Sequence, residues 1–451
     1  MAIPFFMIPI ITRLLPSPMY YGIAESNTLV VSFGSAIALV GMYDAMFRLF
    51  FDSEEMEYKK RVCSTALIAT IVTSIFVIII ILLLNEYLAV LFFGSNNLSH
   101  VIMIAAFSVF FKTISTIVGA PTRMLNNRRI FLSVNVVSSL IAYGVAIVLI
   151  MNGYYVTALP LGDFVAVSCI CISFFFLNKK WFSFIFFSID ILKEILKIGI
   201  PILPIFLIYW VYNSVDRLMI TSILGIEYTG VYSVAIKLGH LSQLIYVAFA
   251  GGWQYFAFKT MREANQVENN SAIFEYLAVV SFSATAFMCC LSKILFDNLF
   301  TTDYSSAYIV APYFFLAPLL LMLYQVNGNQ FLVVKKTWIG LCVLTFGALI
   351  NVLLNSILIP RNGIEGAAIA TMLGYIVSVV VCSIVVWRMN LFIINRRMLI
   401  CSLLFTVYFV SWRTIAYDKI ILSLSLVVTL YVIYSYMYKN DINKLFKALR
   451  R

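Results

Sequence analysis

Long apolar runs separated by short polar breaks form the main pattern along the chain. The run ALIATIVTSIFVIIIILLL, which begins at Ala66, shows it clearly. An apolar segment of about 20 residues can cross the hydrocarbon core of a bilayer as a helix. The pattern therefore predicts an all-α polytopic membrane protein with about 14 transmembrane helices. The predicted spans cover residues 2–15, 26–50, 63–84, 98–120, 130–151, 155–177, 199–223, 229–257, 273–296, 307–334, 338–359, 366–387, 398–416 and 420–438.

Composition supports the same class of protein. Hydrophobic residues make up 63% of the 451 residues and charged residues only 11%, whereas about a quarter of the residues in a soluble domain are charged. The mean hydropathy is +0.99. These values exclude a single water-soluble core. A transmembrane β-barrel is disfavoured as well, because its strands would be short segments of alternating polarity.

The net charge of +11 has a topological explanation. If the N-terminus faces the cytoplasm, most of the 31 lysines and arginines fall in loops on the cytoplasmic side. Basic loops of membrane proteins tend to stay on that side. The distribution therefore predicts a multi-pass protein with both termini in the cytoplasm, and nucleic acid is not an expected partner.

The first predicted span is short. Only eleven residues precede Thr12 and Arg13, and about 20 are needed to cross a bilayer. Either the protein begins upstream of Met1, or its first helix is short and packed against its neighbours. The length rule favours a start upstream.

Two stretches do not fit the pattern of spans. Residues 179–198 mix aromatic side chains with Lys and Glu at helical spacing, which predicts an amphipathic helix in the cytoplasmic interface. The C-terminal stretch KNDINKLFKALRR is basic and is expected to anchor on anionic lipid.

Two pairs of similar segments indicate an internal repeat. An Ile-Thr dipeptide ends the first span at Thr12 and the seventh at Thr221, an offset of 209 residues. An Asn-Gly dipeptide ends a span at Asn152 and again at Asn362, an offset of 210 residues. A repeat of this length holds six spans, so the two halves are expected to be parallel repeats with a site between them.

The repeat predicts four segments. Residues 1–178 would form an N-terminal six-helix bundle with a short first helix, and residues 179–198 an amphipathic linker. Residues 199–390 would form a second, pseudo-symmetric six-helix bundle. Residues 391–451 would add two helices and a basic cytoplasmic tail.

Charged residues inside the predicted spans are candidates for a functional site, because an ionised side chain in a bilayer should face a bundle interior or water. The alternative for each is a structural ion pair or a side chain that reaches the interface. Asp44 and Arg48 lie four residues apart and could pair on one helical face. Lys237 and His240 lie three apart on one face. The remaining candidates are Lys112, Asp163, Asp216 and Arg217.

Asp216 and Arg217 are adjacent and diverge by about 100° around a helix. One of them is expected to reach a neighbouring helix while the other lines a cavity. Across all the predicted spans, basic candidates outnumber acidic ones, and neutral His240 adds no charge. The sequence thus predicts a modestly cationic cavity suited to a phosphate or pyrophosphate.

Cysteine and histidine offer no metal or cofactor site. The chain has eight cysteines without a CxxC pair and only two histidines, His100 and His240. No metal, cofactor or disulfide framework is expected.

Three segments resemble bacterial polysaccharide (O-antigen or capsule) repeat-unit flippases, which belong to the multidrug/oligosaccharidyl-lipid/polysaccharide exporter superfamily. The segment ITRLLPSPMYYG, from Ile11, is similar to the end of their first span. VDRLMITSILGIEYTGVYSVAIKLG, from Val215, resembles their seventh and eighth spans. NVLLNSILIPRNGIEGAAIATMLGY, from Asn351, resembles a turn found across the superfamily.

This resemblance implies two six-helix bundles arranged as a V around a central cavity. It implies translocation of undecaprenyl-pyrophosphate-linked oligosaccharides across the bacterial cytoplasmic (inner) membrane by alternating access, for O-antigen or other surface polysaccharide. Membrane lipids, a polysaccharide polymerase and chain-length proteins would be partners. Basic cavity residues matter in such proteins, and the corresponding candidates here are Arg13, Arg48, Lys112, Arg217 and Lys237.

Two other functions remain open. A cation-coupled multidrug exporter could use Asp44, Asp163 and Asp216 as coupling carboxylates. A membrane glycosyltransferase or polymerase is less consistent with the short predicted outside loops, which contain no paired-carboxylate or nucleophile motif. A transporter, and not an enzyme, is therefore expected.

Overall fold

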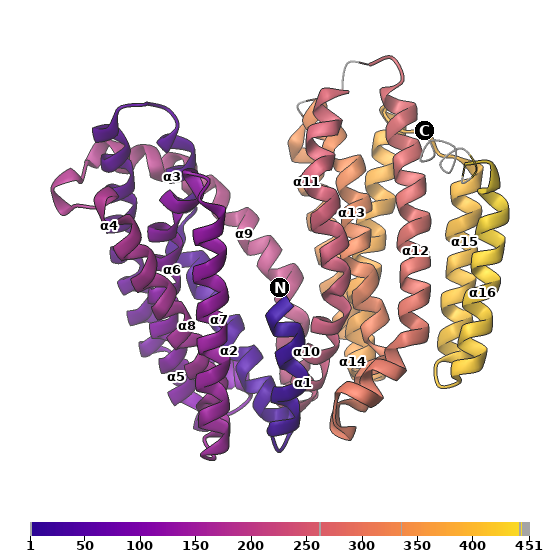
Figure 1. The fold of residues 1–451 in the computed structure, drawn as a ribbon, viewed down its shortest axis with the longest axis horizontal. Coiled ribbons are helices and arrows are strands. Elements are labelled where there is room, and N and C mark those ends of the chain that lie inside the picture. The colour runs from indigo at the N-terminus through magenta and orange to yellow at the C-terminus, as the bar shows by residue number, and fades with distance from the viewer. Residues whose placement is uncertain (1, 261–262, 335, 442, 444–451) are drawn as a thin grey trace. The chain divides into compact units, whose positions relative to one another are not determined.

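The computed structural model describes residues 2–260, 263–334, 336–441 and 443, and it consists of helices joined by short turns (Figure 1). Among these residues no β-strand occurs, so the predicted all-α class is confirmed. The helices pack into two compact units, Met1–Ser233 and Val234–Arg451. Most of the predicted basic tail, residue 442 and residues 444–451, lies outside the described residues.

The first unit contains nine complete helices and the beginning of a tenth. They are α1 (Ala2–Leu14), α2 (Pro18–Leu39), α3 (Met42–Phe50), α4 (Met56–Leu83), α5 (Asn85–Phe93), α6 (Ser99–Met124), α7 (Arg128–Met151), α8 (Tyr155–Asn178), α9 (Ile189–Ile223) and the first part of α10 (Ile226–Gly239).

The second unit begins within α10 and runs to the end of the described chain. Its other elements are η4 (His240–Ser242), α11 (Gln243–Lys259), α12 (Gln266–Leu299), η5 (Thr302–Ile309), α13 (Ala311–Val333), α14 (Thr337–Arg388), α15 (Arg396–Ser411), η6 (Trp412–Ala416) and α16 (Ile420–Met437).

The division by packing differs from the one that the repeat predicts. Contacts place all of α9 with the N-terminal helices, so the boundary falls inside α10 rather than at residues 179–198. The four segments inferred from the repeat stay a prediction.

The helices support a multi-pass membrane protein. In the described part of the chain, ten helices are long and apolar enough to cross a membrane, or up to eleven if η5 and α13, bent by 45°, form one span. The predicted count of 14 is not confirmed. One reason is that α14 counts once, although it joins two helices that meet at Gly363.

Two glycines agree with the repeat at the level of the backbone. Gly153 follows Asn152 between α7 and α8 and has a φ of 84°. Gly363 follows Asn362 at the break in α14 and has a φ of 61°. Positive φ is accessible to glycine at little cost. Two helix breaks that lie 210 residues apart therefore both contain a glycine with positive φ.

The predicted span 26–50 is wrong as a single helix. It breaks at Val40 and Gly41, which have φ values of 46° and 68°, and continues as the short helix α3. The break brings Gly41 against Gly199 of α9, where a Cβ on Gly41 would lie 2.4 Å from the Gly199 carbonyl oxygen. Close backbone contact between α3 and α9 thus depends on two glycines.

The amphipathic helix predicted at 179–198 is helical only from Ile189 onward. Residues Lys179–Trp181 and Phe184–Phe186 make two short 3₁₀ turns, and the residues from Ile189 onward are the first turns of the long helix α9. The helix that begins there runs without interruption through Gly199, where the linker was expected to end.

Side chains of α4 explain why the first part of this segment is not α-helical. The backbone amide of Ser183 donates to Ser64 Oγ at 3.0 Å, and the amide of Ser188 donates to Thr65 Oγ1 at 3.0 Å. Amides held in this way are not available for helical hydrogen bonds. Trp181 is buried, so this part of the segment packs on the protein itself.

Two apolar clusters fill the first unit. One lies where α3, α4, α6 and α8 meet and includes Met46, Phe50 and Phe174. The other lies between α2, α5 and α6 and includes Ile23, Phe92 and Val101. Both involve α2–α3 and α6, which also line the pocket described below.

The N-terminal part of α10 is held closely against α2. A Cβ on Gly22 would lie 2.0 Å from the carbonyl oxygen of Ile226, and a Cβ on Gly230 would lie 2.0 Å from the carbonyl oxygen of Pro18. Small residues allow such close helix contacts in membrane proteins.

We expect Gly22→Ala to lower the thermal stability of the purified protein. The new methyl group meets backbone and not a movable side chain, and overpacking of this kind costs about 1–3 kcal/mol. Thermal unfolding in detergent measures the effect. Gly144→Ala is the matched control, because Gly144 lies in α7 with no atom within 4 Å of the added Cβ. Equal melting temperatures for the two variants would contradict the close packing of α2 and α10.

Candidate functional site

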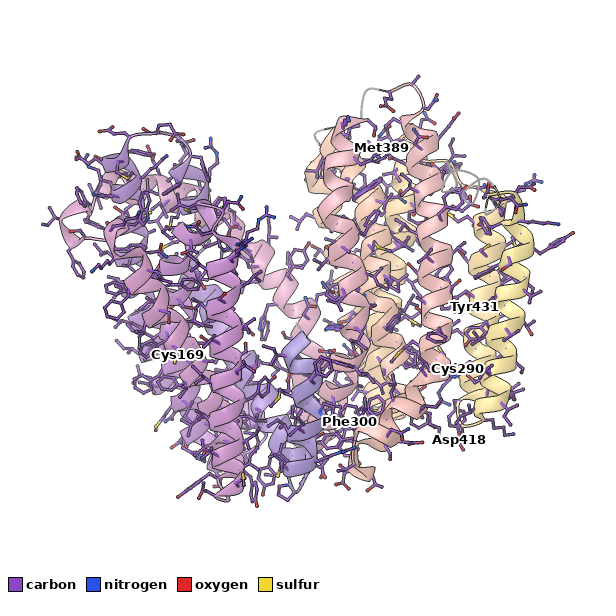
Figure 2. The ribbon with its side chains drawn as sticks, in the orientation of Figure 1. Cys169, Cys290, Phe300, Met389, Asp418 and Tyr431 are labelled. Carbon is purple, nitrogen blue, oxygen red and sulfur yellow. The ribbon has the colours of Figure 1, made fainter. Side chains whose placement is uncertain are left out.

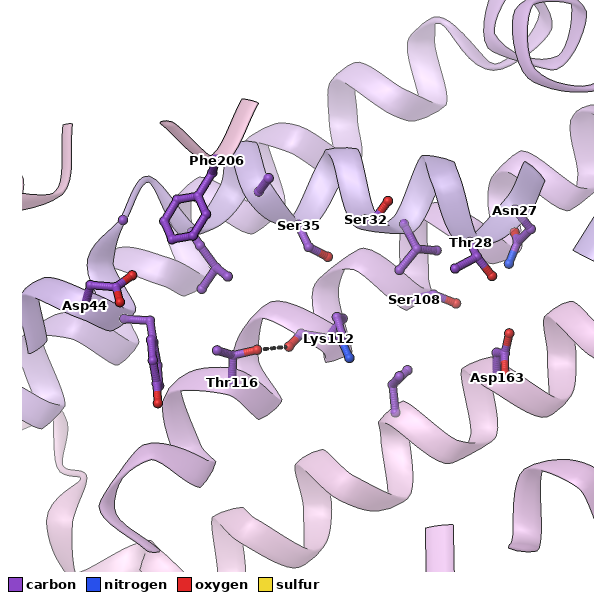
Figure 3. Close-up of a pocket in the computed structure, with 16 residues that line it drawn as sticks. Asn27, Thr28, Ser32, Ser35, Asp44, Ser108, Lys112, Thr116, Asp163 and Phe206 are labelled. Atoms are coloured by element: carbon purple, nitrogen blue, oxygen red, sulfur yellow. Dashed lines mark hydrogen bonds between the residues drawn. The ribbon is translucent and has the colours of Figure 1, made fainter. Parts of the chain in front are cut away.

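A pocket of about 590 Å³ lies within the first unit (Figure 3). Its volume is in the range of about 300–1,000 Å³ that is common for ligand sites. Helices α2, α3, α6, α8 and α9 contribute to its wall. The polar residues of the wall are Asn27, Thr28, Ser32, Ser35, Tyr43, Asp44, Ser108, Lys112, Thr116 and Asp163. This pocket, with polar and charged side chains in the wall of a bundle of apolar helices, is the strongest candidate site in the described chain.

Two helices supply most of this polarity at regular spacing. Ser108, Lys112 and Thr116 follow one another every four residues along α6. Asn27 or Thr28, Ser32 and Ser35 do nearly the same along α2. Residues three or four apart share one face of a helix. Each helix therefore presents a polar stripe to the pocket, and eight residues extend about 12 Å along the axis.

Three of the predicted charged residues line this one pocket. Figure 3 shows Lys112 of α6 between Asp44 of α3 and Asp163 of α8. Lys112 and Asp163 are exposed, and Asp44 is partly buried. The structure gives the Lys112 ammonium group no ion pair with a described residue. The structure thus brings together residues that are far apart in sequence and that sequence analysis selected one by one.

The charge balance of the pocket differs from the expected one. Its lining residues include one lysine and two aspartates, so the predicted cationic excess is absent from this pocket. The predicted excess of basic residues in a cavity between the two repeats is not tested by this pocket and stays a prediction.

Asp216 and Arg217 do not line the pocket, and both bridge to other helices. Asp216 is buried and accepts hydrogen bonds from Tyr232 Oη at 2.5 Å and from the Arg217 amide at 2.8 Å. Arg217 pairs with Glu25 of α2 at 3.2 Å. The expectation that one of the two would line a cavity is therefore not met in this pocket. Instead the pair connects α9 to α10 and α2.

Arg48 pairs with Asp52 and not with Asp44. The pair with Asp52 spans one turn at the end of α3, and both side chains are exposed. The Asp44 carboxylate lines the pocket instead (Figure 3). The four-residue spacing suggested that Arg48 would pair with Asp44. Arg48 pairs instead with Asp52, the next acidic residue along the chain.

The remaining candidates lie elsewhere. Arg13 is exposed in the last turn of α1. Lys237 and His240 are exposed at the junction of α10 and η4, in the second unit. The His240 ring packs edge-on to Phe314, with 6.2 Å between the ring centroids. The three side chains do not line the pocket, and their predicted role in substrate binding stays a prediction.

Sequence analysis missed the carboxylates that hold helices together. Glu25, which pairs with Arg217, lies 192 residues away from it in the chain.

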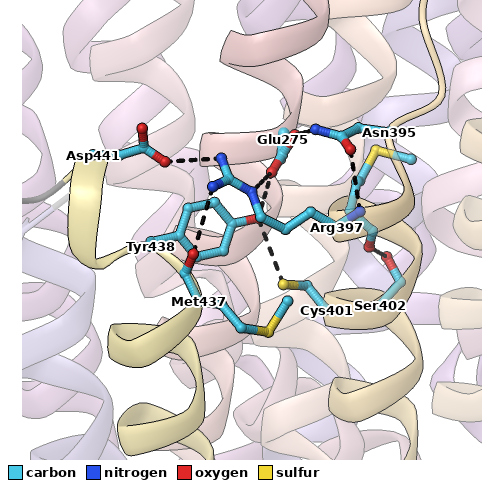
Figure 4. Close-up of polar contacts among 9 residues, drawn as sticks. Glu275, Asn395, Arg397, Cys401, Ser402, Met437, Tyr438 and Asp441 are labelled. Atoms are coloured by element: carbon cyan, nitrogen blue, oxygen red, sulfur yellow. Dashed lines mark hydrogen bonds and ion pairs between the residues drawn. The ribbon is translucent and has the colours of Figure 1, made fainter.

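A second case is Glu275 of α12 (Figure 4), which binds Arg397 of α15 at 2.7 Å and accepts a hydrogen bond from Tyr438 Oη at 2.6 Å. Arg397 also pairs with Asp441 at 2.8 Å and stacks over the Tyr438 ring at 4.1 Å. Burial together with the hydrogen bond to Glu275 raises the pKa of the Tyr438 hydroxyl.

The other ends of α15 and α16 are anchored in a similar way. Arg413, in the π-helical turn that follows α15, binds both carboxylate oxygens of Glu365 in α14, and Tyr313 Oη donates to the same carboxylate at 3.0 Å. Lys293 of α12 binds Asp418, which lies in the turn before α16 (Figure 2). The sequence did contain one indication of such ion pairs. A single glutamate inside an apolar run, such as Glu275, indicates a buried carboxylate that needs a partner.

No group of three or more His, Cys, Asp or Glu side chains in the described part of the chain could hold a metal ion. The pocket offers hydroxyl, amide, carboxylate and ammonium groups. Such groups can bind a polar ligand and exchange hydrogen bonds with it, and they supply no nucleophile activated by a neighbouring base.

Solved structures with the same fold are flippases and transporters. A structure titled "Lipid II flippase MurJ, inward closed conformation" matches with a TM-score of 0.70 and 15% identity, over 98% of this chain and 99% of that one. An inward-facing multidrug resistance MATE family transporter of the MOP superfamily matches with a TM-score of 0.63 and 14% identity, over 86% and 94%. The crystal structure of a MATE mutant matches with a TM-score of 0.56 and 17% identity, over 86% and 92%. At these identities the likeness shows the fold alone.

No curated protein sequence matches the chain. A family model described as "Polysaccharide biosynthesis protein" matches residues 10–309. That match covers well over half of the chain, including every residue of the pocket. The chain therefore belongs to the polysaccharide biosynthesis protein family.

Proposed function

We propose that this protein translocates undecaprenyl-pyrophosphate-linked oligosaccharide repeat units across the bacterial cytoplasmic membrane by alternating access. The proposal rests above all on the pocket, which places hydroxyl, amide and charged side chains within a bundle of apolar helices. A lipid-linked sugar needs such a path, because its headgroup is polar and the bilayer interior is not. Family membership supplies the context of polysaccharide biosynthesis, and the proposal extends it to surface polysaccharide of the O-antigen or capsule type.

The fold supports the same function. The structure titled as a lipid II flippase shares it over nearly the whole of both chains. Membrane lipids would be constant partners, and a polysaccharide polymerase and chain-length proteins would receive the product. The distribution of basic loops supports a topology with both termini in the cytoplasm, which belongs to this proposal.

A cation-coupled multidrug exporter is the second candidate. The observation in its favour is that Asp44 and Asp163 both line the pocket, where only one lysine opposes them. Carboxylates within a helix bundle can bind a cation or a proton. The MATE transporters share the fold, though with lower coverage and TM-scores.

We expect Lys112→Ala to reduce export of the lipid-linked repeat unit by tenfold or more while membrane abundance stays unchanged. Lys112 is exposed in the pocket wall, so its loss removes a ligand contact without leaving a buried partner unpaired. Surface polysaccharide and lipid-linked intermediates are measured in a deletion strain complemented with each variant. The deletion strain itself should accumulate repeat units on the cytoplasmic side.

Lys193→Ala is the matched control for this experiment. Lys193 lies in the same unit, but its side chain is exposed and pairs only with exposed Asp190. Equal export by the two variants would remove Lys112 from the substrate path. A deletion strain that gains drug sensitivity and keeps normal surface polysaccharide would favour the exporter instead.

We expect Arg217→Ala to lower stability rather than transport itself. The substitution removes the Arg217 cation from beside buried Glu25, and loss of one partner from a buried pair costs on the order of 3–5 kcal/mol. The double variant Arg217→Ala with Glu25→Gln should recover part of the lost melting temperature and membrane abundance. A stable Arg217→Ala protein with no transport would assign Arg217 to the substrate path.

A further inference from the structure

Two buried polar atoms in the wall of the pocket have no hydrogen-bond partner among the described residues. They are Asn27 Oδ1 and Ser35 Oγ, and their residues are 1% and 7% exposed. Buried polar groups in proteins are nearly always hydrogen-bonded, so each exception needs a physical explanation. Both residues line the pocket from α2, eight positions apart. Because both residues border the pocket, a polar ligand bound there would supply the missing bonds.

The spacing of the polar side chains indicates the shape of that ligand. Each stripe, on α2 and on α6, extends about 12 Å, which is longer than a single sugar ring. The hydroxyls of Thr28, Ser32, Ser108 and Thr116 donate to carbonyl oxygens of their own helices, so toward a ligand they act as acceptors. A ligand that fits both stripes is elongated and carries many hydrogen-bond donors along its length. The hydroxyls of a short oligosaccharide have this property.

The aromatic residues of the pocket fit a ligand made of rings. Tyr43 of α3 and Phe206 of α9 line the same pocket, and Phe206 lies on the side of Asp44 (Figure 3). Aromatic faces can pack against the apolar face of a sugar ring while its hydroxyls reach the surrounding polar groups.

The charges indicate which substituents the ligand carries. Lys112 lies midway along the α6 stripe, with Asp44 beyond one end of the stripe and Asp163 near the other (Figure 3). A carboxylate accepts hydrogen bonds, so the two aspartates suit sugar hydroxyls at the ends of the ligand. An ammonium group forms its strongest bonds with an anion, so Lys112 suits one acidic group near the middle. A pyrophosphate carries more negative charge than one carboxylate, so the two aspartates of the pocket repel it more strongly.

We propose that this pocket is a glycan subsite that selects oligosaccharides carrying a carboxylate, such as those with a uronic acid, and that Lys112 binds the carboxylate. The proposal rests on the proposed function and adds to it the chemical class of the sugar. The pyrophosphate and the lipid then bind outside this pocket.

The test measures sugar binding directly, by isothermal titration of the full-length protein in nanodiscs. The probes are a disaccharide of glucuronic acid and glucose, its neutral counterpart cellobiose, and inorganic pyrophosphate. We expect the acidic disaccharide to bind about tenfold more tightly than cellobiose, as one charge-assisted contact implies. Lys112→Met should abolish this preference, and Lys112→Arg should retain it. Lys193→Met, the control outside the pocket, should leave it unchanged.

Ser35→Ala tests the unpartnered hydroxyl separately. The substitution should lower the affinity for both disaccharides several-fold and by the same factor, because it removes a hydrogen bond and no charge. Three outcomes would overturn the proposal: binding of neither disaccharide, a preference that persists in Lys112→Met, or pyrophosphate binding that depends on Lys112.

A flipping assay separates this proposal from the proposed function. In it, vesicles that contain the protein receive a fluorescent lipid-linked oligosaccharide. Flipping without binding of the soluble disaccharides would reject the glycan subsite alone. Disaccharide binding without flipping would reject the proposed translocation and leave the subsite standing.

Discussion

Pairs between a largely buried glutamate and one arginine organise both units. Glu25 binds Arg217 in the first unit, and in the second Glu275 binds Arg397 and Glu365 binds Arg413. Each pair joins different helices, with partners 192, 122 and 48 residues apart in the sequence. A charge within an apolar bundle is costly when it stands alone, and it becomes tolerable when an opposite charge and hydrogen bonds surround it. These pairs therefore fix which helices lie together.

The same constraint separates structural charges from those that a ligand can reach. Arg217 and Asp216 have their bonds within the protein, to Glu25, Tyr232 and the Asn213 carbonyl. Lys112 differs from them, because it is exposed in the pocket wall and forms no ion pair with a described residue. Asn27 and Ser35 of the same pocket add buried polar atoms that lack partners. A lysine without a described ion pair and two polar atoms without described partners thus occur together in this pocket.

The sequence predicted best those features that depend on the length of an apolar run or on the cost of burying a charge in a membrane. Apolar runs predicted most helices, and the depth of Lys112 and Asp163 within their spans selected two residues of the pocket. Prediction was weakest where the partner of a charge lies far away in the chain. Nothing near Arg217 in sequence points to Glu25, so a structural arginine was assigned to a cavity. The break at Val40 and Gly41 was missed for a related reason, since its partner, Gly199, lies in another helix.

The two C-terminal helices extend this reasoning to the second unit. They lie outside the predicted repeat, and α15 and α16 contact each other and α12. Glu275 holds Arg397 at the beginning of α15, Glu365 holds Arg413 just beyond its end, and Lys293 holds Asp418 in the turn between α15 and α16. The π-helical turn at Trp412–Ala416 places Arg413 where it can reach Glu365, two residues beyond the break at Gly363. Attachment at both ends makes the pair an integral part of the second unit, so any motion of that unit must carry α15 and α16 with it.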